Sequence, residues 1–289
     1  MHGMWRVFRA ECMRLLASRS AAASAIFLVT VPALRVFAAH AAVAAEHASA
    51  VHSALSKGRA IPESPPPGNA YGPLVDGWSA GLVLGALILL AYSARSLASD
   101  RATGLARIAT TRSASRSALV WGRALLGLPM SLAVVALTGL GATIAAGVWF
   151  EFGPLVEDGY QLMSHPELDA ELAKSVLATL PPLIALWSLG LLVASMSRSG
   201  SGALFLSLGV FLCFDLFKDL LGDARYYCFA SFCPSLVDDS CIAEMSAVAR
   251  GMSDAGFSEN LYRMNLILPI PEALVLITLA GWILSRRTL

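Results

Sequence analysis

The residues best suited to chemistry in this sequence form a basic segment, 99–123, that lies between two strongly apolar runs. Its only acid is Asp100, and Leu105, Ile108 and Leu119 give the segment an apolar side. Its basic residues are Arg101, Arg107, Arg112, Arg116 and Arg123. A basic amphipathic stretch between two membrane spans is expected to lie at the membrane surface and to contact a soluble partner. The segment therefore predicts recognition of another protein.

Three ionisable residues fall inside apolar runs, where an unpaired charge is costly. Arg35, Asp215 and Glu272 lie at similar distances along their runs, and about 1.5 Å per helical residue places all three roughly 20 Å from the inner surface. We expect them to share one layer in which Arg35 pairs with Asp215 or Glu272. The layer is either a polar gate or substrate contact, or a purely structural pair. Snorkelling of these side chains to the outer interface is the remaining alternative.

Three of the five cysteines, Cys228, Cys233 and Cys241, share one segment that we expect outside the membrane. An oxidising compartment would favour one disulfide among them and leave the third cysteine over. The sequence does not select the pairing.

Signals for metal, nucleotide or catalytic chemistry are weak. His40, His47 and His52 lack a carboxylate or cysteine cluster at ligand spacing, so we expect no metal site. Lys174 is the one lysine followed by serine, and Ala173 precedes it, so no Walker loop for ATP is present. The Gly-Ser-Gly at 200–202 also lacks the full Gly-x-Ser-x-Gly spacing of a serine hydrolase. We therefore expect neither enzyme activity nor a bound cofactor, and no nucleic-acid partner.

Membrane-spanning helices must position these residues. The chain is 56% hydrophobic and 14% charged, and its apolar residues come in long blocks, which is typical of a multi-pass membrane protein. We predict a single all-α membrane domain over 1–289, in which an amphipathic helix at 3–19 lies flat in the inner interface before the first span. The six spans are expected at 21–43, 78–97, 117–150, 175–196, 203–221 and 266–284.

The distribution of charge predicts the orientation of these spans. Thirteen arginines but only two acids, Glu11 and Asp100, lie in or beside the segments that we place in the cytoplasm. Because arginine and lysine are enriched on the cytoplasmic side of membrane proteins, both termini are expected to be cytoplasmic. The more acidic segments 44–76, 151–171 and 222–265 are expected outside.

The basic segment also resembles a known family. Asp100-Arg101, Gly104-Leu105, Ser115-Arg116 and Gly122-Arg123 fall on the pattern of the cytoplasmic loop between the second and third spans of ABC-2 type transporter permeases. Asp100 stands where that family usually has glutamate, and Arg112-Ser113 where a proline often precedes the Ser-Arg pair. An ordinary positively charged loop would explain the arginines of this segment but not the spacing of its glycines.

The resemblance implies a permease subunit in a bacterial inner membrane, working as a homodimer or with a related second permease. ATP and Mg²⁺ would bind to separate ABC ATPase subunits, which would push a coupling helix at 98–116 of this chain. In that reading Leu105 and Ile108 fill an apolar groove on the ATPase, while Gly104 allows close backbone approach. Asp100, Arg101 and Arg107 complete the contact, with the arginines meeting an acidic rim.

The resemblance leaves the activity itself open. The first interpretation is ATP-driven export of a solute across the plasma membrane. The second is mechanical, as in the permease of nitrous-oxide reductase maturation, whose layout is similar: ATP-driven motion would pass to a periplasmic partner protein without solute movement. The third is a membrane scaffold or sensor that has no ATPase.

Overall fold

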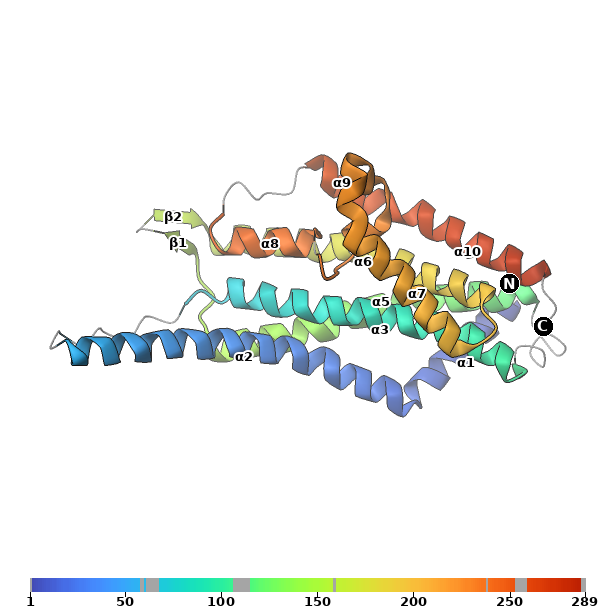
Figure 1. Cartoon of the computed structure of the whole chain (residues 1–289), viewed down its shortest axis with the longest axis horizontal. Helices are drawn as coiled ribbons and strands as arrows, with labels where there is room; N and C mark the ends of the chain where they lie inside the picture. Colours follow the sequence, from blue (N-terminus) through green and yellow to red (C-terminus); the bar gives the residue numbers. More distant parts are fainter. Residues whose placement is uncertain are drawn as a thin grey trace.

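The computed structural model describes residues 2–57, 60, 68–105, 115–157, 160–237, 239–252 and 259–286. The fold is all-α, and six of its helical segments are long and apolar enough to cross a membrane (Figure 1). The α-helices are α1 (His2–Leu16), α2 (Arg19–Ser56), α3 (Tyr71–Ala102), α5 (Arg116–Trp149), α6 (His165–Met196), α7 (Gly200–Phe217), α8 (Cys241–Ala249), α9 (Glu259–Ile267) and α10 (Pro269–Arg286). The six long segments are α2, α3, α5, α6, α7 with the 3-10 helix that follows it, and α9 with α10. The protein is thus a multi-pass membrane protein with a short amphipathic helix at its start.

Two of the long helices extend well beyond the spans expected from the sequence. Helix α2 continues through an alanine-rich stretch to Ser56. Helix α6 begins at His165, ten residues before the expected start of its span at 175. The cause is a capping box: the Glu167 carboxylate accepts hydrogen bonds of 2.8 Å from both the backbone N–H and the hydroxyl of Ser164. One third of the acidic segment 151–171, residues 165–171, therefore belongs to helix α6.

The remainder of that segment and the one at 222–265 also hold regular structure. Strands β1 (Leu155–Glu157) and β2 (Tyr160–Met163) form an antiparallel pair in which Leu155 lies opposite Met163. After α7, the chain forms the 3-10 helices η1 (Lys218–Tyr227) and η2 (Phe229–Phe232) before it enters α8. Helix α8 lies towards the same end of the bundle as the β1–β2 hairpin (Figure 1), and we call these two elements the distal cap.

Helices α3 and α6 form the centre of the bundle. In the most apolar 18-residue stretch of each helix, 56% of the residues of α3 and 61% of those of α6 are buried inside the protein. The corresponding share is only 17–22% in α2, in α7 with η1, and in α9 with α10. The outer helices leave large apolar side chains exposed, as expected where a helix faces lipid. Small residues allow close contact between helices: a Cβ at Gly141 of α5 would collide with the carbonyl oxygen of Val29 in α2.

The two ends of the bundle differ in structure. Helix α1 and the end of α10 lie at one end, here called the basal end, and the β1–β2 hairpin lies at the other, here called the distal end (Figure 1). On α1, Trp5 stacks on Phe8 with ring centroids 5.0 Å apart, and the side chain of Leu16 is 90% exposed. These exposed apolar residues suit a helix that lies in a membrane interface.

Candidate functional site

A buried network of charged side chains joins three helices at the basal end. Arg123 of α5 donates to Glu11 of α1 from Nε at 2.9 Å and from Nη2 at 2.7 Å. The same guanidinium donates to Asp100 near the end of α3. Arg14 of α1 donates to the other oxygen of Asp100 at 2.9 Å. Two arginines and two carboxylates thus fix α1, α3 and α5 to one another.

Burial makes this network a strong constraint. The side chains of Arg123, Glu11 and Asp100 are 3%, 9% and 10% exposed, whereas that of Arg14 is 52% exposed. Buried charges of this kind are tolerated only when they are paired and hydrogen-bonded, and removal of one partner leaves the others unpaired. The hydrogen bond and the charge of Asp100 raise the pKa of the Arg14 guanidinium above its ordinary value. Arg14 therefore stays charged in ordinary buffers.

Backbone packing supports the network from both sides of Arg123. The preceding residue, Gly122, faces α1 so closely that a Cβ there would lie 2.7 Å from the Val7 Cβ and 2.9 Å from the Met4 carbonyl oxygen. On the other side, the indole Nε1 of Trp187 in α6 donates to the Arg123 carbonyl oxygen at 3.0 Å. The Gly122-Arg123 pair thus holds α1 against α5 and positions the guanidinium.

The segment that follows the network changes direction and becomes exposed. Arg101 donates from Nη1 to the carbonyl oxygens of Ser195 and Ser197 at 2.9 and 3.0 Å, which caps the end of α6. Helix α3 then ends, and Gly104 takes a left-handed conformation with φ of 76° that glycine adopts readily. The next side chain, Leu105, is 49% exposed.

Among the predicted coupling residues, the structure separates an anchored group from an exposed one. Asp100 and Arg101 hold α3 to its neighbouring helices, and the contact of Arg101 with an acidic rim on a partner stays a prediction. Gly104 and Leu105 lie at the surface. Arg107 and Ile108 lie outside the described residues.

The expected polar layer of Arg35, Asp215 and Glu272 is not formed. Arg35 is exposed on α2 and pairs with neither acid. The Glu272 carboxylate accepts a hydrogen bond of 2.8 Å from the backbone N–H of Phe229. Asp215 pairs instead with Lys218, one turn further along the chain. The three side chains therefore do not meet, and each acid has a different partner.

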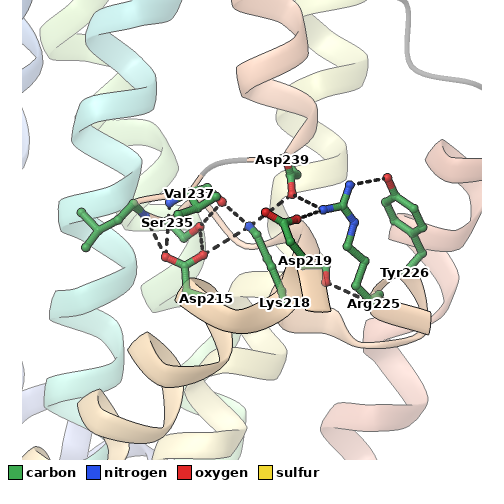
Figure 2. Close-up of polar contacts among 10 residues, drawn as sticks. Asp215, Lys218, Asp219, Arg225, Tyr226, Ser235, Val237 and Asp239 are labelled. Carbon is green, nitrogen blue, oxygen red and sulfur yellow. Dashed lines mark hydrogen bonds and ion pairs between the residues drawn. The ribbon is translucent and has the colours of Figure 1, made fainter. Parts of the chain in front are cut away.

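Asp215 belongs to a second buried network, at the junction of α7 with η1 (Figure 2). The Lys218 ammonium is fully buried, lies 3.2 Å from Asp215 Oδ1 and 3.4 Å from Asp239 Oδ2, and also donates to the carbonyl oxygen of Val237. Asp215 accepts further bonds from the Ser235 hydroxyl at 2.6 Å and from two backbone N–H groups. The network holds residues 235–237 and Asp239 against the end of α7.

The periphery of this second network is more exposed. Arg225 lies 3.4 Å from the same Asp239 oxygen, donates to Asp219, and donates to the Tyr226 hydroxyl at 2.9 Å (Figure 2). Nearby on α8, burial and the charge of Asp239 raise the pKa of Glu244 to about 7. Glu244 is therefore half protonated near neutral pH.

A third set of contacts attaches the distal cap to α3. Asp76, in the second turn of α3, accepts hydrogen bonds from Arg250 Nη2 at 2.5 and 2.6 Å and from the Ser246 hydroxyl at 2.5 Å. Ser246 belongs to α8, and Arg250 directly follows this helix. Helix α3 is thus bound through carboxylates at both of its ends.

The cysteine expectation is corrected by the structure. Cys228, Cys233 and Cys241 are all thiols, and no disulfide joins them. The Cys233 thiol donates to the carbonyl oxygen of Pro182 at 3.5 Å, and the Cys241 sulfur accepts from Asn265 Nδ2 at 3.2 Å. The Cys233 and Cys241 sulfur atoms thus contact different helices, α6 and α9.

Two of the histidines, His40 and His165, contact aromatic side chains. The His40 ring stacks on Trp149 with centroids 6.0 Å apart, and His165 bonds to the Tyr71 hydroxyl at 2.7 Å. Within the described part of the chain, no three histidine, cysteine or acidic side chains gather closely enough to hold a metal ion.

Comparison of the chain with protein-family models gives no match, and comparison with curated proteins gives none either.

Sequence reasoning missed several residues of these networks. Glu11 was noted only as one of two acids among thirteen arginines in the inner segments. The excess of arginines was the signal that this carboxylate pairs with one of them. Lys218 falls inside the expected span 203–221 and was not singled out, although the i, i+3 spacing of Asp215 and Lys218 allows them to pair on a helix. Asp76 and Arg250 gave no signal, because 174 residues separate them in the chain.

Proposed function

We propose that this chain is the membrane subunit of an ABC transporter, driven by separate ATPase subunits that bind ATP and Mg²⁺. The observation that carries the proposal is the arrangement at the end of α3. The residues that resemble the ABC-2 coupling loop begin at Asp100, which accepts hydrogen bonds from α1 and α5. The exposed Leu105 lies five residues further along the chain. An apolar side chain that projects from a rigid base suits a surface on which a partner pushes.

The packing of α3 supports transmission of such a push. Asp100 and Arg101 connect the end of α3 to α1, α5 and α6, so a displacement at Leu105 would move these helices together instead of bending one of them. We propose that the basal end faces the cytoplasm of a bacterial cell, because the arginine-rich segments belong to that end. In this proposal the chain itself is not catalytic and acts with a second permease copy.

A specific observation also supports the mechanical alternative. Asp76 attaches the distal cap directly to the helix that bears Asp100. Motion of α3 would therefore reach the cap, which could pass it to an extracytoplasmic partner protein without moving a solute. Solute export remains the first proposal, since the cap would also serve as the outer wall of an export path.

The test is to tag the chain at its N-terminus, solubilise the membrane in mild detergent, and identify the proteins that co-purify. The export proposal predicts an ATPase with a Walker loop as the stoichiometric companion, and the mechanical alternative predicts a soluble outer protein in addition. Leu105→Asp should reduce recovery of the ATPase about tenfold or more, because it places a charge in an apolar contact. Leu220→Asp is the matched control, since Leu220 is equally apolar and even more exposed but lies in η1, after the far end of α7. Recovery of the chain without any ATPase would reject both forms of the proposal and leave the scaffold or sensor alternative.

A further inference from the structure

Two adjoining cavities near the basal end have opposite chemical character. The first, of about 470 Å³, lies between α1, α2, α3 and α7. Its wall carries the guanidinium groups of Arg14 and Arg95 and the hydroxyls of Ser18, Ser20 and Tyr92. No acidic side chain lines it among the residues that the structure describes. We call it the cationic cavity.

The second cavity, of about 320 Å³, is almost entirely apolar. Its wall comes from the end of α1 and from α2, α3 and α5, and includes Leu16, Leu28, Met130 and Ala133. It shares three wall residues with the cationic cavity: Ser24, Ile88 and Tyr92. We call it the apolar cavity.

The charge of the cationic cavity is available to a ligand. Arg95 is exposed on α3, and no ion pair holds it within the described ranges. Arg14 uses Nη1 for Asp100 and keeps its other guanidinium donors. Asp100 lies behind Arg14, outside the cavity wall, and is already paired with Arg123 as well. The cavity therefore carries a net positive charge that an anion would neutralise.

The position of the pair of cavities matches the edge of a bilayer. Ser18 and Ser24 bracket the first turns of α2, and Arg95 lies two turns before the end of α3. At about 1.5 Å per residue, the cationic cavity lies within roughly 10 Å of the helix ends, where lipid head groups are found. The apolar cavity continues from it towards the middle of the helices.

We propose that the two cavities together bind one anionic phospholipid, independently of whether the chain couples to an ATPase. The phosphate would accept hydrogen bonds from Arg14 and Arg95 and from the serine hydroxyls, and an acyl chain would occupy the apolar cavity. Basic pockets between membrane helices recognise anionic head groups in this way. A free phosphate or a soluble phosphorylated molecule would fill only the cationic cavity, so the apolar cavity beside it selects the lipid as the occupant.

The first test concerns binding of the lipid head group in the cationic cavity. The protein, with any subunits that accompany it, is purified from nanodiscs that hold phosphatidylglycerol and phosphatidylcholine in equal amounts. We expect the retained lipid to be enriched in phosphatidylglycerol. Arg95→Gln should lower this enrichment about tenfold, the effect of losing one charge-assisted hydrogen bond. Arg198→Gln is the matched control, since Arg198 is also exposed at the basal end but lines neither cavity. Equal losses in both variants would show general surface attraction and overturn the site.

The second test concerns binding of the acyl chain in the apolar cavity, and it needs a variant that leaves the arginines in place. Ala133→Trp projects into the apolar cavity from α5 and should abolish phosphatidylglycerol retention, whereas Ala136→Trp, exposed on the same helix outside the cavity, should retain it. Competition with glycerol phosphate distinguishes the sources: it should displace the lipid only weakly. Retention that survives Ala133→Trp, or displacement by glycerol phosphate at the same concentration as by lipid, would overturn the proposal in favour of a soluble anion.

Discussion

Asp76 and Asp100 lie on the same helix, α3, and each accepts hydrogen bonds from arginines of other helical segments: Asp76 from Arg250, and Asp100 from Arg14 and Arg123. The two carboxylates are separated by about 36 Å along the helix at 1.5 Å per residue. One anchor holds the distal cap and the other holds the basal helices. Helix α3 therefore connects the two ends of the protein as a single rigid element, which is what transmission between the two faces of a membrane requires.

The basal network predicts a large loss of stability when its shared arginine is removed. Arg123→Met leaves Glu11 and Asp100 buried without their main partner, and should lower the free energy of unfolding by about 3–5 kcal/mol. Unfolding in mixed micelles by titration with a denaturing detergent measures this change. Neutralising both acids in the same variant, Glu11→Gln with Asp100→Asn, should recover part of the loss. A cost no larger than that of Arg198→Met at the exposed basal surface would contradict the role given to the network.

Two glycines provide a matched test of the contact between α1 and α5. Gly122→Ala places a Cβ 2.7 Å from the Val7 Cβ, so α1 must shift, and the variant should lose about 1–3 kcal/mol. Gly281→Ala in α10 meets no atom within 4 Å and should gain about 0.5 kcal/mol from helix propensity. The same unfolding assay compares them, and two changes of the same sign would mean that α1 does not pack on α5 as described.

Glu244 predicts a pH dependence of stability in the acidic to neutral range. Its pKa is raised from 4.5 to about 7 in the folded protein, mainly by burial and then by the charge of Asp239. The folded state therefore binds this proton more tightly than the unfolded state, so Glu244 contributes stability below about pH 4.5 that is lost as the pH rises through 7. Glu244 faces a cavity between the β1–β2 hairpin, α6 and α8. The other acid that lines this cavity among the described residues is Glu171, which pairs with Lys174.

Glu244→Gln should remove this share of the pH dependence, because glutamine does not titrate. The melting temperature of the variant between pH 5 and 8 should vary less than that of the wild type. Glu46→Gln, at an exposed position on α2, serves as the control and should keep the wild-type slope. An unchanged slope in Glu244→Gln would show that another group is responsible.

The spans could be predicted from sequence because the bilayer sets their length and every backbone polar group within it must be bonded inside the helix. Apolar blocks of the required length therefore identify the six long segments directly. The extensions beyond the bilayer follow different rules. The start of α6 depends on the Ser164 and Glu167 capping box, a local signal that the sequence contains and that hydropathy ignores.

The polar contacts were harder to predict, for a geometric reason. The rise per residue gives the depth of Arg35 and Asp215 in the membrane, but not the direction in which each side chain points once the helices pack. Asp215 of α7 pairs with Lys218, the first residue of η1, whereas Arg35 is exposed on α2. Asp100 was recognised from its motif, yet its contact with Arg14 and the contact of Arg123 with Glu11 depend on α1 folding back against α5, which no local pattern encodes.

The most direct test of the central claim, that the surface after α3 receives an ATPase, is cross-linking from a defined position. A photoactivatable amino acid replaces Leu105 in cells, and the control positions are Leu16 on α1 and Leu220 in η1, both highly exposed and apolar. After illumination, the Leu105 position should form a cross-link to a chain that contains a Walker loop, and the two controls should not. Cross-links from Leu105 to lipid or to this chain alone, in cells where an ATPase co-purifies, would contradict the account.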